Sequence, residues 1–277
     1  MDVLDLWPDA IAGSGMVSSQ VVIKGSAMLS DFACRIADRI TVPTEGFAAR
    51  LGNTGDIKNK LSVIPNWADK RIYSPAPRNQ DFGNKFGLEK KFCIIHAGNI
   101  GPFQDIANVL SAAEQLRGLG SLRIVFVGGG RDIEAMKRIK EEKNLENVVF
   151  TGPYPTAEMS GIFAWGEGLL VSLRADPYLD INLPSKLPAY MASGKPVIAC
   201  AGGESSKLVA ENNIGVSCKP GDPVALADTI RGFFALSQEE RNIMGRNGLL
   251  LFDKSYDKDR LIYKYVKMLE GLCKARE

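Results

Sequence analysis

A glycine-bearing turn directly follows the apolar run of residues 92–97 and precedes a helical pattern. It contains Gly98, Asn99 and Gly101. Glycine lets the backbone approach a ligand closely, and the free N–H groups at the start of the next helix favour phosphate oxygens. An ordinary strand-to-helix turn also uses glycine, so the turn indicates either a phosphate site or a purely structural connection.

A second turn of this kind follows the apolar run of residues 122–127 and contains Gly128, Gly130 and Arg131. The dinucleotide fingerprint G-x-G-x-x-G would need glycine where the chain has Ile133, and no G-x-x-x-x-G-K-[ST] phosphate loop occurs. These sequences therefore argue against an NAD enzyme and against an ATP-hydrolysing P-loop enzyme. Arg131 could pair with a diphosphate through both of its terminal nitrogens, or be an exposed arginine in the first turn of a helix.

The segment 183–199 carries a lysine at an unfavourable place. Pro184 and Ser185 suit the start of a helix, so that Lys186 falls in the first turn. The helix dipole disfavours a cation there by about 0.3 kcal/mol or more. An anionic ligand explains this position better than helix stability does. We therefore predict that Lys186 contacts a phosphate group, with a solvated lysine as the alternative.

Metal and histidine chemistry find little support in the sequence. The one histidine, His96, lies inside an apolar run, where we predict a buried core residue and not a catalytic one. The five cysteines include no C-x-x-C pair, so neither a zinc site nor another metal is expected. Their scatter indicates reduced, mostly buried thiols.

From about residue 92 onward, short apolar runs without polar alternation are separated by helical patterns. The runs cover residues 92–97, 122–127, 148–151, 168–173, 196–200 and 214–217. They predict the strands of a parallel sheet with helices on both faces, which is a doubly wound α/β domain. Such sheets bind ligands beyond the carboxyl ends of their strands, which is where both glycine-bearing turns fall.

The first 75 residues differ, with helical patterns at 30–37 and 44–51 on either side of a strand at 38–42. The proline-bearing stretch 73–77 is the predicted domain boundary. Over the 277 residues, a net charge of +2 argues against nucleic acid as the main partner. Neither an apolar run of about 18 residues nor a basic, signal-like N-terminus occurs, which predicts a cytoplasmic protein that is soluble or at most peripheral at the inner face of the membrane.

Residues 183–199, followed by residues 202–209 with Glu204, resemble the sugar-nucleotide-binding core of family 4 glycosyltransferases, and most closely the branch that builds bacterial surface polysaccharides. The resemblance covers essentially the whole chain. Further landmarks that agree in order and spacing are residues 5–9, 37–44, 63–69, 97–101, 127–130 and 150–154.

This resemblance implies the GT-B fold, in which two Rossmann-like domains face each other across a cleft. Residues 1–75 would be a remnant of the N-terminal acceptor-side domain. Residues 76–256 would form the C-terminal nucleotide-sugar-binding domain, and residues 257–277 a helix that crosses back to the first domain. Such enzymes retain anomeric configuration without a metal or another cofactor, because helix dipoles and basic side chains stabilise the leaving diphosphate.

Carried onto this chain, the resemblance places residues 98–101 beside the phosphates. Ser185 and Lys186 would contact the diphosphate or the ribose, and residues 151–154, which include Tyr154, would flank the base. Glu204 belongs to the same sugar-nucleotide-binding core.

The chain departs from the family pattern at three places. Ala189 stands where many members carry a ribose-binding glutamate, and Ile181, eight residues earlier, is not acidic either. The turn at residues 98–101 leads into Pro102 and Phe103 instead of Arg and Lys. The landmark at residues 5–9 normally lies well inside the first domain, so about 100 or more residues of that domain are expected to be missing, together with its acceptor loops and its histidine.

The sequence therefore predicts a glycosyltransferase that moves a sugar from a nucleotide donor, favoured to be a UDP-sugar, to a saccharide or lipid-linked acceptor in cell-surface polysaccharide synthesis. A non-catalytic sugar-nucleotide-binding module, or half of a split enzyme that pairs with a complementing N-terminal fragment, is the alternative. A GT-B UDP-sugar epimerase is a further alternative that a single strand-borne histidine supports poorly.

Overall fold

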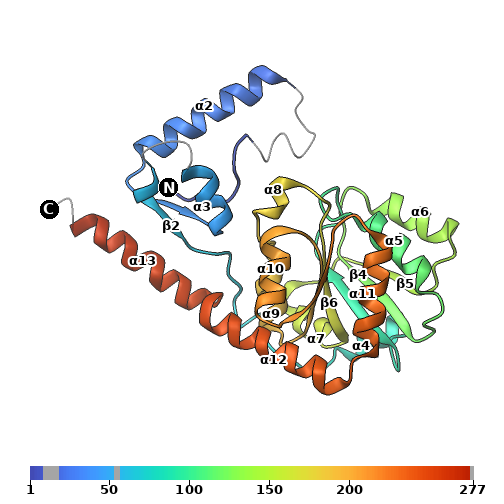
Figure 1. Ribbon diagram of the computed structural model, residues 1–277. Coiled ribbons are helices and arrows are strands. Elements are labelled where there is room, and N and C mark those ends of the chain that lie inside the picture. Colours follow the sequence, from blue (N-terminus) through green and yellow to red (C-terminus); the bar gives the residue numbers. More distant parts are fainter. Residues whose placement is uncertain (9–18, 53–56, 275–277) are drawn as a thin grey trace.

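The computed structural model describes residues 1–8, 19–52 and 57–274, which fold into a smaller and a larger lobe (Figure 1). The elements of the smaller lobe are α2 (Gln20–Ile36), β1 (Ile40–Val42), α3 (Glu45–Gly52), the short 3-10 helix η1 (Lys58–Lys60) and β2 (Leu61–Val63). Helix α13 (Lys258–Lys274) extends from the larger lobe toward the smaller one (Figure 1).

The larger lobe is built on a six-stranded sheet in the order β5-β4-β3-β6-β7-β8, in which every neighbouring pair is parallel. The strands are β3 (Phe92–Ala97), β4 (Leu122–Val127), β5 (Val148–Gly152), β6 (Gly166–Ser172), β7 (Val197–Cys200) and β8 (Gly215–Cys218). The chain runs from β3 to one edge and from β6 to the other, so the order reverses between β3 and β6. The predicted doubly wound parallel sheet is confirmed.

The helices of the larger lobe cover both faces of this sheet (Figure 1). They are α4 (Gln80–Phe86), α5 (Ile106–Gln115), α6 (Ile133–Glu142), the short 3-10 helix η2 (Thr156–Glu158), α7 (Met159–Phe163), α8 (Pro177–Asp180), α9 (Lys186–Ala192), α10 (Gly203–Glu211), α11 (Pro223–Ala235) and α12 (Gln238–Ser255). Alternate strand residues enter two cores: Ile94 packs with α5 and α11, and Ile95 with α7, α9 and α12. Because both faces are buried, the strands are continuous apolar runs.

Local signals explain several helix starts. The Asp222 side chain accepts hydrogen bonds from two backbone N–H groups at the start of α11, where Pro223 occupies the first helical position. Ser237 and Glu240 form a capping box at the start of α12. The prediction missed α4 and α8, which have only 7 and 4 residues and therefore give weak helical patterns.

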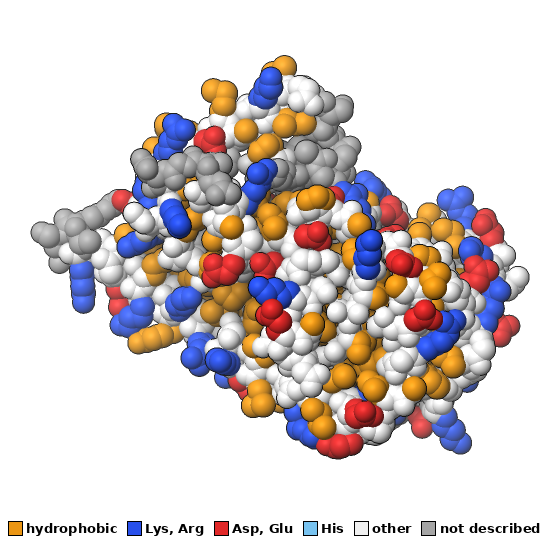
Figure 2. All heavy atoms as spheres, viewed as in Figure 1, with side chains coloured by type: hydrophobic (Ala, Val, Ile, Leu, Met, Phe, Trp, Pro, Cys, Tyr) orange, Lys and Arg blue, Asp and Glu red, His pale blue; other side chains and the backbone are white. Residues whose placement is uncertain are grey.

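The smaller lobe has a two-stranded parallel sheet and its own core, which includes Val3, Ile40 and Phe47. Helix α2 begins ten residues earlier than the predicted helix at 30–37. The helix carries exposed apolar side chains along its length, and Figure 2 shows hydrophobic side chains at the top of the molecule, where α2 lies. The exposed apolar side chains of α2 include Val21, Met28, Leu29, Phe32 and Ile36.

The two lobes are connected by the segment between β2 and α4 and by contacts of α13. A bridge pairs Ala68 with Asp257, and the Lys264 ammonium donates a hydrogen bond to the Val63 carbonyl at 2.8 Å. The domain boundaries at residues 75 and 256 remain predictions. Asp9 of the first landmark and residues 275–277 of the last segment lie outside the described residues.

The structure also bears on the cysteines and on membrane-spanning helices. All five cysteines are free thiols, and three of them, Cys34, Cys93 and Cys200, are buried. Within the ranges that the structure describes, none of the helices combines the length and the apolar character needed to cross a bilayer.

Candidate functional site

A cavity of about 960 Å³ opens where the order of the sheet reverses. Its walls are the turns after β3, β4 and β5, the start of α9, and Leu4 and Asp5 of the smaller lobe. Doubly wound sheets bind their ligands at this place, because the reversal of strand order leaves a crevice beyond the carboxyl ends of the strands. We therefore take this cavity as the candidate functional site.

The glycine-bearing turns form one wall because they pack directly on each other. Gly98 has a φ of 119° and Gly128 a φ of 142°, a region that side chains rarely adopt. A Cβ atom on Gly128 would lie 2.0 Å from the Gly98 carbonyl oxygen, and one on Gly130 would lie 2.3 Å from the Ile100 carbonyl oxygen. Close contact between the two turns thus requires glycine at positions 128 and 130.

Lys186 begins α9, and its side chain extends under the first turn. The ammonium nitrogen would be 3.5 Å from a Cβ atom on Gly98, and it lies 3.1 Å from Nε2 of His96. Burial lowers the pKa of Lys186 to about 7. This lysine is therefore not the solvated side chain that the sequence left as an alternative.

His96 is fully buried on β3, as predicted, and its ring is held at both nitrogens. Nδ1 lies 3.1 Å from the Leu170 carbonyl oxygen, which can only accept a hydrogen bond. Nδ1 therefore carries the proton, and Nε2 can accept from Lys186. The Asn99 backbone is a further hydrogen-bond neighbour of the ring. Burial, and then the charge of Lys186, hold the pKa of His96 well below its ordinary value.

Tyr190, one helical turn after Lys186, ties α9 to the end of β3. Its hydroxyl accepts a hydrogen bond from the Ala97 amide at 2.8 Å and lies 3.3 Å from the Ala97 carbonyl oxygen. Burial raises the pKa of this fully buried phenol. Residues four apart lie on one helix face, so the bonds of Tyr190 to Ala97 also fix the position of Lys186 relative to the end of β3.

An aromatic group forms the opposite end of the cavity, after β5. Tyr154 packs edge-on against Phe82 with ring centroids 5.1 Å apart, and Lys85 lies 3.4 Å from its hydroxyl. The contact comes from α4, which the sequence analysis did not find. Tyr154 therefore presents a flat, half-buried surface beside the turn at Pro153.

Among the described residues, the cavity has charged side chains of two residues only, Asp5 and Lys186. They stand on different lobes. The Tyr178 hydroxyl of α8 donates to Asp5 at 2.9 Å and so connects the lobes at the rim. The sequence analysis missed Asp5 and Tyr178 as site residues, because their contact joins positions 173 residues apart.

The structure brings together some of the predicted site residues and not others. Six of them line the cavity: Gly98, Asn99, Gly128, Tyr154, Ser185 and Lys186. Gly101 and Gly130 lie behind this surface, in the turns themselves. Arg131 pairs with Asp132 and is largely exposed. Glu204 accepts a hydrogen bond from the Gly46 amide at 3.2 Å, and thus links α10 to the smaller lobe. Direct ligand contacts of these residues remain predictions.

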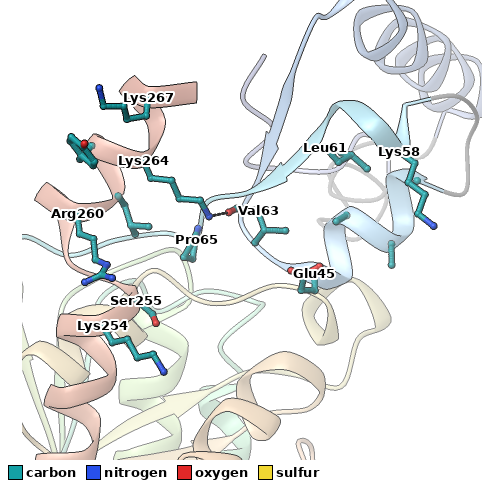
Figure 3. Close-up of a pocket in the computed structure, with 15 residues that line it drawn as sticks. Glu45, Lys58, Leu61, Val63, Pro65, Lys254, Ser255, Arg260, Lys264 and Lys267 are labelled. Atoms are coloured by element: carbon teal, nitrogen blue, oxygen red, sulfur yellow. Dashed lines mark hydrogen bonds between the residues drawn. The ribbon is translucent and has the colours of Figure 1, made fainter. Parts of the chain in front are cut away.

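A second hollow, a groove of about 1340 Å³, lies between α3, β2 and the last two helices (Figure 3). Its basic side chains are Lys58, Lys254, Arg260, Lys264 and Lys267, and Glu45 is its one acidic residue among those described. These basic residues are exposed, and the groove has no turn from the carboxyl edge of the larger sheet. It lacks the buried charge and close backbone approach that the cavity has.

Neither hollow has the composition of a metal centre. In the described parts of the chain, no three His, Cys, Asp or Glu residues come close enough together to hold a metal ion. The cavity offers a ligand backbone amides, hydroxyls, side-chain amides, aromatic surfaces, the Asp5 carboxylate and the ammonium group of Lys186.

Comparison with known sequences gives a family match and several relatives. Residues 78–250 match the family model described as "Glycosyl transferases group 1". The probable glycosyltransferase WbjE of Pseudomonas aeruginosa is 29% identical over 232 residues, which cover 82% of this chain and 58% of WbjE. The putative colanic acid biosynthesis glycosyl transferase WcaI of Escherichia coli K12 is 23% identical over 98% of this chain and 67% of its own length. The chain thus spans about three fifths to two thirds of these relatives.

Solved structures show the same fold at low sequence identity. Anabaena HepE in complex with UDP-glucose superposes with a TM-score of 0.78 at 18% identity, over 91% of this chain and 68% of HepE. The sucrose-phosphate synthase of Thermosynechococcus elongatus gives a TM-score of 0.78 at 19% identity, over 99% of this chain and 67% of its own. The predicted GT-B fold class is confirmed.

Proposed function

The chain belongs to the group 1 glycosyl transferases, and we propose that its cavity binds the nucleoside diphosphate of a sugar donor, favoured to be a UDP-sugar. The sugar would pass to a saccharide or lipid-linked acceptor in the synthesis of a bacterial surface polysaccharide. The observation that carries this proposal is the Lys186 ammonium group, half-buried beneath two packed glycine turns at the switch point of the sheet.

The diphosphate would lie between Lys186 and the backbone of residues 98–101. A phosphate oxygen there meets a cation whose surroundings are poor in water, so their attraction is stronger than between two exposed groups. The Ser185 hydroxyl at the rim can donate a further hydrogen bond. Negative charge that develops on the diphosphate as the sugar leaves would be stabilised by the same groups, without a metal ion.

The base and the sugar would occupy the two ends of the cavity. Tyr154 offers an aromatic surface to the base, and its position is fixed by Phe82. Asp5, from the smaller lobe, is the charged group that could accept hydrogen bonds from sugar hydroxyls. We further propose transfer with retention of configuration, as the resemblance implies.

The names of the relatives support the choice of acceptor class. WcaI is named for colanic acid biosynthesis, and a third relative, of Escherichia coli, is named an O-antigen chain mannosyltransferase. We infer that this chain acts on a growing cell-surface glycan, at the inner face of the membrane where such an acceptor would be anchored.

Calorimetric titration with UDP-glucose, UDP, GDP and ADP tests the donor site. We expect selective binding of the uridine nucleotides, and we expect Lys186→Ala to weaken it by at least about 1 kcal/mol, the size of a charge-assisted contact. Lys207→Ala is the matched control, because Lys207 is an exposed lysine of α10 that does not line the cavity. Equal affinity of wild type and Lys186→Ala would contradict the assignment of Lys186.

Donor binding and sugar transfer are separated by a second measurement. Release of UDP from UDP-glucose is followed with and without a polyprenyl-linked saccharide acceptor. Acceptor-dependent release supports a transferase. Binding without release under any acceptor condition would instead favour a sugar-nucleotide-binding module.

A further inference from the structure

The contact between His96 and Lys186 joins an unusual pair of side chains. A half-buried lysine normally faces a carboxylate, yet the Lys186 ammonium nitrogen has a neutral imidazole nitrogen 3.1 Å away. The other ring nitrogen is committed to the Leu170 carbonyl, 3.1 Å away on β6. His96 therefore cannot rotate or change tautomer without losing a buried hydrogen bond.

We propose that His96 is a positioning residue for Lys186, and that this pair takes up one proton from the solvent when a nucleoside diphosphate sugar binds. The proposal rests on the function proposed above. His96 does not touch the ligand: its Nε2 accepts a hydrogen bond from Lys186 and so holds the lysine nitrogen beneath Gly98. The proton that Lys186 gains comes from water, and the imidazole stays neutral throughout.

The surroundings give the direction of this proton transfer. In the empty cavity, burial lowers the pKa of Lys186 to about 7, so near neutrality much of the protein carries an uncharged amine there. Two negative charges on the diphosphate favour the ammonium form and raise this pKa. Binding above about pH 7 therefore requires a proton, and the affinity falls by up to about tenfold for each further pH unit.

The other titratable groups near the pair are held by partners of their own or are buried. Asp5 stands on the other lobe and bonds to Tyr178. Burial raises the pKa of Tyr73 and of Tyr190 above their ordinary value. Helix α12 approaches α9 through Gly245 and Gly248, which carry no charge. After β6, Arg174 pairs with Asp176, and Glu167 of β6 pairs with Arg78 and Arg241. Burial raises the pKa of Asp105 at the start of α5, and its carboxylate accepts a hydrogen bond from the Asn108 backbone.

Because His96 is the only histidine in the chain, its ring nitrogens can be observed without assignment. Tag-free protein labelled with ¹⁵N-histidine is titrated from about pH 6 to about pH 9 and followed in long-range ¹H–¹⁵N spectra. We expect a neutral ring protonated on Nδ1 at every pH, and a shift of Nε2 with a midpoint near 7 that Lys186→Met abolishes. A ring that itself becomes charged in this range, or an Nε2 signal without a midpoint, would overturn the proposal.

Addition of saturating UDP-glucose, or of GDP-mannose in a parallel sample, tests the coupling to the donor. We expect the midpoint to move up by at least about one pH unit, and calorimetry in two buffers of different ionisation enthalpy to show proton uptake. Both ligands carry esterified phosphates that do not titrate near neutrality. Binding without proton uptake overturns this inference and leaves the proposed function intact, whereas binding of neither ligand contradicts the proposed function itself.

Two substitutions separate positioning from general packing. His96→Gln keeps an acceptor at the end of the side chain, and we expect it to retain the pH profile of UDP-glucose affinity. His96→Leu removes the acceptor, and we expect its affinity at pH 8 to fall by about tenfold, with less loss at pH 6. A loss of equal size at both pH values, or in both variants, would show that His96 only fills space.

Discussion

The two hollows of the molecule carry positive charge in different ways. The cavity has one lysine, Lys186, half-buried beneath backbone and next to a neutral histidine. The groove between the lobes has five exposed basic side chains, all labelled in Figure 3, of which Lys264 donates to the Val63 carbonyl. An exposed charge is screened by water and ions, whereas a charge with few waters around it interacts strongly with a bound anion.

This difference predicts that the surroundings of a positive charge contribute more to anion binding than the number of charges does. The two hollows also differ in the backbone that forms their walls. The cavity wall is made of turns that only glycine can form, and the groove wall is made of ordinary helix and strand surface. Substitutions in the cavity and in the groove test this contrast, and Gly128→Ala is expected to have the largest effect.

Gly128→Ala tests whether the cavity wall depends on its close turns. The added Cβ atom would lie 2.0 Å from the Gly98 carbonyl oxygen on a backbone with φ of 142°. We expect a loss of at least about 3 kcal/mol in the free energy of unfolding, and a Tm lower by about 10 °C. Thermal unfolding followed by circular dichroism measures it.

Two glycines serve as controls for this substitution. Gly129 is the next residue of the same turn, and Gly52 lines the groove. A Cβ atom on Gly129 meets nothing within 4 Å, and one on Gly52 meets Leu61 at an ordinary 3.7 Å. Both alanine variants should unfold within about 2 °C of wild type. A similar loss in all three variants would mean that close packing of the turns is not the cause.

Tyr190→Phe should have the next largest effect, because it removes the hydroxyl that joins α9 to Ala97. The buried Ala97 amide would lose its partner at 2.8 Å, at a cost of about 2 kcal/mol in the free energy of unfolding. UDP-glucose affinity should fall as well, since the start of α9 is no longer fixed. Tyr263→Phe, on an exposed tyrosine of the groove, should change the stability by less than about 0.5 kcal/mol.

The sequence was sufficient for the sheet and for the lysine. The runs at residues 92–97 and 122–127 are apolar except for His96 and Arg123, as expected of strands buried on both faces. They became β3 and β4 at those bounds. Lys186 was singled out because an anionic ligand explains a cation in a first helical turn better than helix stability does, and its contact with a phosphate stays a prediction. Both arguments are local, and both can be made within one element.

The contacts that complete the site were not accessible in this way. His96 was predicted to be buried, but its bond to Lys186 joins residues 90 positions apart. Local patterns likewise gave no sign that Glu204 accepts from the Gly46 amide, 158 positions away. Such pairings are decided by how turns and helices from different parts of the chain meet, and one sequence without relatives does not contain that information.

Lys264→Ala in the groove is expected to have the smallest effect. Its comparison with Lys186→Ala in the cavity tests the contrast between the two hollows directly. The Lys264 ammonium group donates to the Val63 carbonyl at 2.8 Å, but both the lysine and the groove are open to solvent. We expect UDP-glucose affinity to change by less than about twofold and unfolding free energy by less than about 0.5 kcal/mol. Lys186→Ala, measured by the same calorimetric titration, removes the same charge from the cavity. If the two variants weakened UDP-glucose equally, the overall positive potential of the protein would account for donor binding, and the half-buried position of Lys186 would have no special part in it.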